Sequence, residues 1–280
     1  MPHPGVLCVG AGGQLGSALT ARGVRGLGRA ELDITDRAAV MAHPDLGSAD
    51  VVINCAAFTA VDDAESHPQA AAAVNEAGAG YLAQACAASG AFLIHISTDY
   101  VFDGQVLADG TARPWSTTDT PAPRTVYGRT KLAGERAVQQ VCPRSAIVRT
   151  AWLYDGRTPD FVTTMRRLEA TQDTIRVVDD QYGCPTFVGD LADALIALAK
   201  RPTPGLFHLT NSGVTTWCGL AREVFELVGA DPQRVVPCTT EEFPRPAPRP
   251  QWSALDGSAW VAAGYEGLPE WRDGLRRALL

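Results

Sequence analysis

The stretch VLCVGAGGQLGSAL (residues 6–19) joins a short apolar run to a glycine-rich turn and then to a segment rich in alanine and leucine. The apolar run is typical of a buried parallel strand, and the segment after the turn is typical of a helix. Gly10, Gly13 and Gly16 have a G-x-x-G-x-x-G spacing. Glycine permits a sharp turn, a close approach of the backbone to a pyrophosphate and tight packing of the helix on the strand. An ordinary glycine-rich turn is the alternative, but the position between strand and helix favours a dinucleotide site.

The same alternation of apolar runs and alanine-rich stretches continues to about residue 150. Strands are predicted at 6–9, 24–29, 51–54, 92–96 and 146–148, and helices at 14–22, 67–89 and 127–140. This order predicts right-handed strand–helix–strand units in an α/β fold with a Rossmann-like, doubly wound parallel sheet.

After Trp152 the alternation is less regular. Here we predict helices at 161–170 and 189–200, strands at 175–178 and 206–209, and little regular structure in the proline- and arginine-rich segment 237–250. We expect residues 1–152 with about 181–211 to form the dinucleotide-binding domain. Residues of about 153–180 with 212–280 would form a smaller mixed α/β substrate lobe.

Composition excludes several classes of protein. A net charge of −7 argues against a nucleic-acid-binding surface. The seven cysteines include no C-x-x-C pair and the five histidines are dispersed, so we expect reduced thiols and no metal site. The N-terminus lacks the pattern of a signal peptide, and no apolar run is long enough to span a bilayer. These features predict a cytoplasmic protein without a membrane partner.

The segment ELDITD (residues 31–36) follows the predicted second strand. The carboxylate of Asp33 can accept a hydrogen bond from an adenine amino group while Ile34 covers the ring; a helix N-cap is the alternative. We find no acidic residue at the end of the strand itself, where one would bind an NAD ribose hydroxyl. Arg29 could bind a 2′-phosphate instead, which favours NADPH over NADH.

Small residues end the strand at 51–54. Ala56 and Ala57, followed by Phe58, come where a parallel sheet leaves room for a cofactor ribose. A closely packed strand end would explain them nearly as well.

Tyr127 and Lys131 stand four residues apart, on one face of a predicted helix. An adjacent cation lowers the pKa of a phenol and makes it a better proton donor near neutral pH. Only two of the 24 lysines and arginines in the chain are lysines, Lys131 and Lys200. Thr98 follows the strand predicted at 92–96, and its hydroxyl could hydrogen-bond a substrate carbonyl there. A solvated helix face is the alternative for Tyr127 and Lys131.

Taken in order, the motifs GAGGQLG, LDITD, NCAAFTAVDDAES, HISTDYVFDG, VYGRTKLAGE, VRTAWLY, VVDDQYGCPTFVGDLA and RPQWSAL run through nearly the whole chain. With them the chain resembles the extended short-chain dehydrogenase/reductases and, among these, the dTDP-4-dehydrorhamnose reductases of actinobacterial type. The resemblance implies reduction of dTDP-4-dehydro-L-rhamnose to dTDP-L-rhamnose with NADPH, or alternatively NADH. It also implies the following roles: catalysis by Thr98, Tyr127 and Lys131; cofactor binding by Gly10, Gly13, Gln14, Leu15, Gly16, Asp33, Ile34, Ala56, Ala57, Phe58, Tyr127 and Lys131; substrate binding by Thr98, Asp99, Trp152 and Arg249.

Two positions depart from the family pattern. Phe58 stands where the family often has tyrosine, and Ala18 stands where some members have a glutamate that binds Mg²⁺ in a dimer. We therefore expect a monomer or weak homodimer without metal.

Three other functions remain open: a sugar-nucleotide epimerase or lyase of the same superfamily, a non-catalytic regulatory subunit of the same fold, and a reductase of another dTDP-deoxysugar. Asp99-Tyr100 argues against a dehydratase, because dehydratases carry Asp-Glu at this point.

Overall fold

The computed structural model describes residues 3–105 and 112–279. Its centre is a six-stranded parallel sheet with the order β2-β1-β3-β4-β5-β10. The strands are β1 (Val6–Val9), β2 (Arg25–Leu27), β3 (Val51–Asn54), β4 (Phe92–Thr98), β5 (Ser145–Thr150) and β10 (Gly205–His208). The predicted doubly wound α/β fold is confirmed; the strand predicted at 175–178 lies outside this sheet, and the other predicted strands lie in it.

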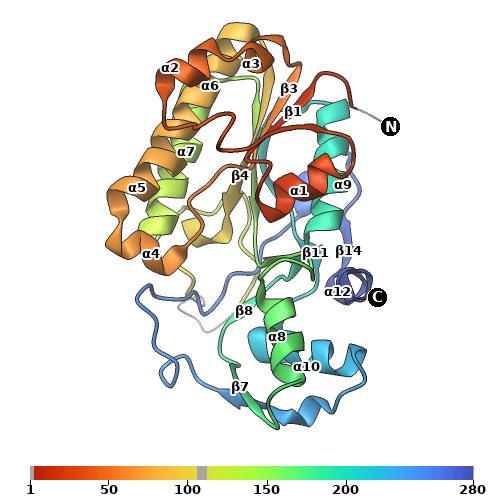
Figure 1. Ribbon diagram of the computed structural model, residues 1–280. Helices are drawn as coiled ribbons and strands as arrows, with labels where there is room; N and C mark the ends of the chain where they lie inside the picture. The colour runs from red at the N-terminus through yellow and green to blue at the C-terminus, as the bar shows by residue number, and fades with distance from the viewer. Residues whose placement is uncertain (1–2, 106–111, 280) are drawn as a thin grey trace.

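Helices cover both faces of the sheet (Figure 1). On one face lie α1 (Gln14–Thr20) and α9 (Val188–Lys200); on the other lie α2 (Arg37–Ala42), α3 (Pro44–Ser48), α6 (Ala79–Ser89) and α7 (Val126–Val141). The short helices α4 (Val61–Ser66) and α5 (Pro68–Ala72) lie at the end of this second layer. Two apolar clusters, one on each face, form the core.

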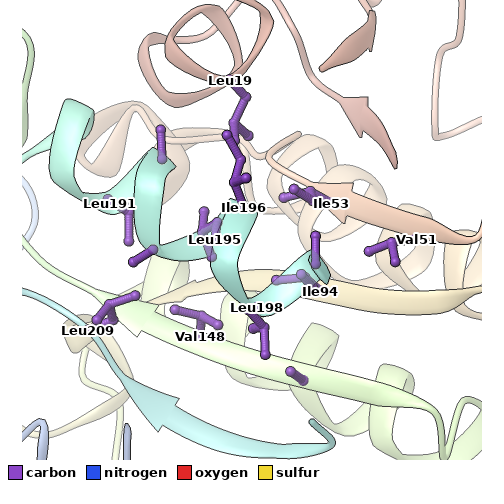
Figure 2. Close-up of a cluster of buried hydrophobic side chains, with 14 of the residues drawn as sticks. Leu19, Val51, Ile53, Ile94, Val148, Leu191, Leu195, Ile196, Leu198 and Leu209 are labelled. Carbon is purple, nitrogen blue, oxygen red and sulfur yellow. The ribbon is translucent and has the colours of Figure 1, made fainter. Parts of the chain in front are cut away.

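Alternation along each strand explains the two clusters. Ile53 packs into the cluster on the α9 side, whereas its neighbour Val52 packs into the cluster on the α6 side. Figure 2 shows Leu195 and Leu198 of α9 among the side chains of the central strands. Both leucines are fully buried, so each removes its whole side chain from water, worth about 1.5–3 kcal/mol.

One predicted helix is wrong in detail. We expected 67–89 to be one continuous helix, but its middle is a π-helical segment, η1 (Ala73–Gly78), between α5 and α6. The segment contacts α7 closely: a Cβ on Gly134 would lie 2.0 Å from the carbonyl oxygen of Asn75. Such widened turns commonly occur where a helix adapts to a functional neighbour.

The smaller lobe contains α8 (Phe161–Glu169), α10 (Trp217–Leu227) and short paired strands (Figure 1). The pairs are β6 (Leu153–Tyr154) with β9 (Thr186–Phe187), β7 (Ile175–Val178) with β13 (Val235–Cys238), β8 (Tyr182–Gly183) with β12 (Thr215–Thr216), and β11 (Asn211–Ser212) with β14 (Leu268–Glu270). A third apolar cluster forms the core of the smaller lobe.

The other elements of the described chain are the 3₁₀ turns η2 (Asp99–Val101) and η3 (Pro232–Arg234) and the helices α11 (Ser258–Ala262) and α12 (Trp271–Leu279).

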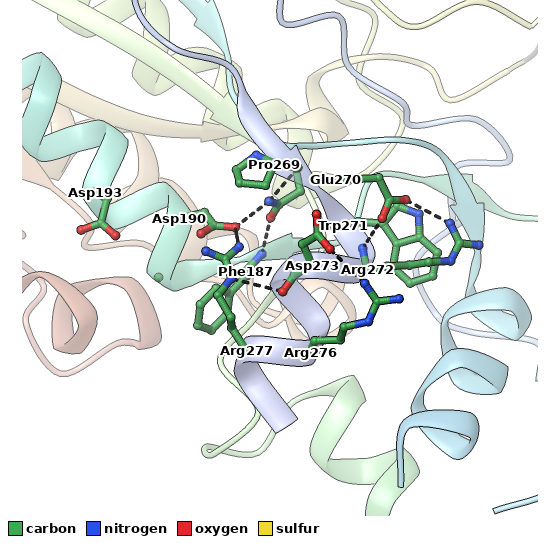
Figure 3. A network of polar contacts seen from close by, with 12 residues as sticks. Phe187, Asp190, Asp193, Pro269, Glu270, Trp271, Arg272, Asp273, Arg276 and Arg277 are labelled. Atoms are coloured by element: carbon green, nitrogen blue, oxygen red, sulfur yellow. Dashed lines mark hydrogen bonds and ion pairs between the residues drawn. The ribbon is translucent and has the colours of Figure 1, made fainter. Parts of the chain in front are cut away.

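Polar contacts anchor α12 to α9 (Figure 3). Asp190 on α9 accepts from Arg277 at 2.7 Å and from Asn211 at 2.7 Å. Asn211 also donates to the carbonyl oxygen of Pro269. Because Asp190 is only 6% exposed, these donors satisfy a carboxylate that would otherwise be buried without hydrogen bonds, at a cost in stability.

None of the helices in the described part of the chain has the length and apolar character that a membrane span requires.

Candidate active site

A cleft of about 1,120 Å³ lies where the parallel strands end and the smaller lobe begins. It is lined by the glycine-rich turn, the loop after β3, the end of β4, the first turns of α7 and parts of α8, β7 and the segment 243–253. This is the edge at which doubly wound sheets bind ligands. All candidate site residues named from the sequence line this one cleft.

The glycine-rich turn has two positions that only glycine can occupy. Gly10 has φ +88°, and a Cβ there would lie 2.4 Å from the backbone nitrogen of Ala56. A Cβ on Gly16 would lie 2.3 Å from the carbonyl oxygen of Gly10. Gly13 is the N-cap of α1 and has no side chain to occupy the first backbone N–H groups. The turn therefore presents a helix N-terminus to the cleft at close range, which suits a pyrophosphate.

Gln14 is held differently from the glycines. Its side-chain amide donates to Thr158 at 2.8 Å and to Asp160 at 3.3 Å. Asp160 is the N-cap of α8 in the smaller lobe. Gln14 thus connects the glycine-rich turn to the smaller lobe across the cleft.

The far end of the cleft holds Asp33, Ile34 and Arg29. The Asp33 carboxylate accepts from the backbone and hydroxyl of Thr35 at 3.0 and 2.7 Å, and these bonds lower its pKa. Its second oxygen lies 3.3 Å from the guanidinium of Arg29, which is exposed at the rim. Ile34 is buried against Gly78 of the π-helical segment. The arrangement offers an apolar surface, a carboxylate and an exposed cation side by side.

Asn75 fixes the loop that carries Ala56, Ala57 and Phe58. Its side chain accepts from the Phe58 nitrogen at 2.8 Å and donates to the Phe58 carbonyl and to Thr130, both at 3.1 Å. Asn75 lies in η1 and is 1% exposed, so the π-helical turn places a polar group between the loop and α7. Our reading of the sequence missed this residue; an asparagine inside an alanine-rich helix was the available signal.

Thr98, Tyr127 and Lys131 come together from two elements. Thr98 ends β4, and its hydroxyl donates to Asp99 at 2.9 Å. Tyr127 and Lys131 lie in the first two turns of α7, which Thr125 caps. The Lys131 ammonium donates to the carbonyl oxygen of Ile96 on β4 at 2.6 Å.

The pKa of Tyr127 corrects one of our expectations. We predicted that the cation of Lys131 would lower it, but burial raises the pKa of Tyr127 to about 12, with a hydrogen bond to Thr98 opposing the shift. Burial lowers the pKa of Lys131 to about 8. At neutral pH the phenol is therefore protonated and the amine is mostly cationic. Tyr127 can therefore donate a proton while Lys131, in the same cleft lining, carries a positive charge.

Asp99 and Thr150 belong to the cleft lining, and each has one buried polar atom that lacks a partner among the described residues. These atoms are Oδ2 of Asp99 and Oγ1 of Thr150. Burial raises the pKa of Asp99 to about 6, and it is 4% exposed. Buried polar groups rarely stay unpaired in the working state of a protein. Both residues therefore mark a part of the cleft wall where polar groups lie close to the surface without partners in the described chain.

Trp152 has the one positive φ of a non-glycine residue among those described, at +50°. Its ring stacks on Trp217 of α10 at 3.6 Å, and Gly183 leaves the space that the ring needs. Strained backbone of this kind often occurs at ligand sites. The predicted Trp152 is thus at the cleft, and Trp217 is a lining residue that the sequence analysis missed.

Arg249 is at the cleft but carries a paired charge. Its guanidinium binds Asp62 of α4 through two contacts, at 2.7 and 2.9 Å. Asp62 has a lowered pKa because these hydrogen bonds outweigh its burial. Arg245 lies nearby with its guanidinium over the ring of Phe243 at 4.8 Å. An anionic ligand here would therefore meet Arg245 as well as the Arg249–Asp62 pair.

Among residues 3–105 and 112–279, no group of three or more histidine, cysteine, aspartate or glutamate side chains could hold a metal ion. The seven cysteines are all free thiols.

Comparison with known proteins gives a consistent result. The family model of the RmlD substrate binding domain matches residues 4–280. A curated protein from Mycobacterium tuberculosis (strain CDC 1551 / Oshkosh), named dTDP-4-dehydrorhamnose reductase, is 52% identical over 98% of this chain and 92% of its own length.

Two solved structures are also similar. The dTDP-4-dehydrorhamnose reductase of Clostridium acetobutylicum has a TM-score of 0.92 with 40% identity, covering 98% of each chain. The dTDP-4-dehydrorhamnose reductase of Bacillus anthracis, solved in complex with NADP, has a TM-score of 0.91 with 35% identity, covering 97% of each chain.

Proposed function

The chain belongs to the RmlD substrate binding domain family. From the residues that line its cleft we propose that it is an NADPH-dependent dTDP-4-dehydrorhamnose reductase. The reaction would convert dTDP-4-dehydro-L-rhamnose to dTDP-L-rhamnose. One observation carries the proposal: the glycine cradle and the group of Thr98, Tyr127 and Lys131 face the same cleft. A dinucleotide and a carbonyl substrate can therefore meet there.

The cofactor would lie along the ends of the strands. Gly10, Gly13 and Gly16, with Gln14 and Leu15, would hold the pyrophosphate at the start of α1. Ile34 with Asp33 would contact the adenine, and Ala56, Ala57 and Phe58 would border the ribose. The exposed guanidinium of Arg29 favours a cofactor with a 2′-phosphate. When bound, the reduced nicotinamide supplies the hydride.

Tyr127 would donate its phenolic proton to the oxygen on carbon 4 of the sugar as that oxygen becomes an alkoxide. Its high pKa keeps the proton on the phenol until charge develops on the substrate. Thr98 would hydrogen-bond the same oxygen. The cation of Lys131 would stabilise the tyrosinate that remains and hold the nicotinamide ribose.

The substrate would extend from this group toward the smaller lobe. Asp99 and Thr150 line this part of the cleft and would contact the sugar, and Trp152 would form an apolar wall. Arg249, with Arg245 nearby, would oppose the charge of the diphosphate. We assign residues 1–152 with about 181–211 to the cofactor domain, and about 153–180 with 212–280 to the substrate lobe.

We further propose that the protein is cytoplasmic. We also propose that it is a monomer or weak homodimer, since Ala18 offers no carboxylate for a metal bridge between two chains.

The experiment is NADPH consumption with dTDP-4-dehydro-6-deoxyglucose, with and without the matching 3,5-epimerase. Oxidation only in the presence of the epimerase, with dTDP-L-rhamnose as product, is the expected result. Turnover without the epimerase would indicate a different deoxysugar product. No turnover in either case, from folded protein that binds NADPH, would reject the reductase in favour of a non-catalytic subunit.

A further inference from the structure

A fully buried ion pair lies behind the catalytic group, outside the cleft lining. Glu135 of α7 accepts from Arg149 of β5 through two hydrogen bonds, at 2.7 and 2.8 Å. Both side chains are 2% exposed. Burying two charges carries a large desolvation cost, so such a pair is weak evidence for stability and calls for another role.

The pair belongs to a polar row across three neighbouring strands. Ser97 of β4, Arg149 of β5 and His208 of β10 stand opposite one another in register. Ser97 donates to Glu135 at 2.5 Å, and Arg149 lies 3.4 Å from Nε2 of His208. Burial lowers the pKa of His208 to about 4, so this ring is neutral and can accept from Arg149. Ser97 and Arg149 thus hold both oxygens of the Glu135 carboxylate through hydrogen bonds.

This row is directly connected to the catalytic residues. Glu135 follows Lys131 by four residues on α7, so the two share one helix face. Ser97 directly precedes Thr98, and the carbonyl oxygen of Ile96 accepts from Lys131. Two successive residues of β4 therefore hold α7 through Lys131 and Glu135. These contacts set the position of Thr98 relative to the helix that carries the phenol.

The titratable groups around Lys131 come from three elements. Tyr127 and Glu135 lie on its own helix, His95 lies on β4, and Cys55 follows β3. Burial keeps the pKa of His95 well below its usual value, and a hydrogen bond with Cys8 together with burial keeps that of Cys55 well above, so both are neutral. Glu135 raises the pKa of Lys131 and thus opposes the effect of burial. Asp99, farther along the cleft, titrates near pH 6.

We propose that Glu135 is a positioning residue, which holds α7 against β4 and supplies the negative charge that keeps Lys131 cationic at the cleft. Arg149, with two hydrogen bonds to the carboxylate, holds it in place for this purpose. The inference rests on the proposed function, since the cation of Lys131 matters for the reaction assigned above.

The chain has two lysines, so each can be followed by itself. Protein labelled with ¹³C at the lysine ε-carbon gives two resonances, and Lys200→Arg identifies that of Lys131. In Glu135→Gln we expect the titration midpoint of Lys131 to fall by about one pH unit. The basic limb of the kcat/KM profile should move by the same amount. Ser97→Ala is the matched control: it removes a hydrogen bond to Glu135 but no charge, and should leave the midpoint unchanged.

Glu135→Gln leaves Arg149 buried without its anion, so the double variant Glu135→Gln/Arg149→Met provides a version with no unpaired charge. It should also lower the midpoint, and thermal unfolding confirms that each variant is folded. An unchanged midpoint in folded Glu135→Gln protein would overturn the proposal, and so would an equal shift in Ser97→Ala. The titration needs no substrate, so a protein that shows the shift but no reductase turnover would refute the proposed function alone.

Discussion

Replacing Asp99 by asparagine should stabilise the protein at alkaline pH while weakening its use of the sugar substrate. Asp99 is 4% exposed, and its Oδ2 atom has no partner among the described residues. Its Oδ1 atom accepts from Thr98, a bond that asparagine can keep through its own oxygen. The substitution therefore removes a buried charge and preserves the shape and one contact of the side chain.

The magnitude follows from the pKa. Burial raises the pKa of Asp99 to about 6 in the folded protein, against the ordinary value of 3.8 for an aspartate. A group with a raised pKa stabilises the fold fully below its unfolded value and loses that contribution as the pH rises through its folded value. The whole difference is worth about 3 kcal/mol, and about 1.4 kcal/mol of it is lost between pH 5 and pH 8. The asparagine of Asp99→Asn does not ionise, so the free energy of unfolding of this variant does not lose this contribution as the pH rises.

Urea unfolding of both proteins from pH 5 to pH 8 measures this difference. The free energy of unfolding of Asp99→Asn, minus that of the native protein, should grow with pH by about 1.4 kcal/mol over the range. The exposed Asp173→Asn should show no such trend. Steady-state kinetics should show a raised KM for the sugar and an unchanged KM for NADPH. A difference that stays flat or shrinks with pH would refute the burial argument.

Three further substitutions test other parts of the structure. Tyr127→Phe should keep NADPH affinity, measured by fluorescence titration, and lose roughly 10²–10⁴-fold in turnover, because it removes the proton donor; near-native turnover would exclude the residue from that role. Arg29→Ala should raise the KM for NADPH about tenfold and leave that for NADH unchanged, since only NADPH has a 2′-phosphate; equal effects on both would contradict the assignment. Leu195→Ala should lower the free energy of unfolding by about 2–5 kcal/mol in urea, through a cavity beneath α9. At urea concentrations below the unfolding transition, the kcat of Leu195→Ala should equal that of the native protein. A decrease of less than about 1 kcal/mol in the free energy of unfolding would show that the core closes the cavity.

The central sheet was predictable because its signals are local. Each strand is a short apolar run, and the glycine-rich turn needs its glycines for reasons that hold within a few residues. Gly10 and Gly16 met this expectation, since neither position has room for a Cβ. The family resemblance was also available from the motifs, and the match to residues 4–280 confirms it.

What the sequence did not reveal depends on contacts between distant segments. The π-helical turn at Asn75 forms against Phe58 and Thr130, so the alanine-rich pattern alone suggested a regular helix. Arg249 meets Asp62 from 187 residues away, a pairing that no spacing rule anticipates. The pKa of Tyr127 was predicted in the wrong direction because burial, which is a tertiary property, raises it more than the hydrogen bond with Thr98 lowers it.

The most direct test of the proposed reaction is the transfer of deuterium. NADPH carrying deuterium at both positions of nicotinamide carbon 4 is incubated with the protein, dTDP-4-dehydro-6-deoxyglucose and the 3,5-epimerase. We predict one deuterium at carbon 4 of the deoxysugar in dTDP-L-rhamnose, seen by mass spectrometry and NMR, with one NADPH oxidised for each product formed. A product without deuterium at carbon 4, or unconsumed NADPH beside intact keto-sugar, would contradict the assignment of this cleft to hydride transfer.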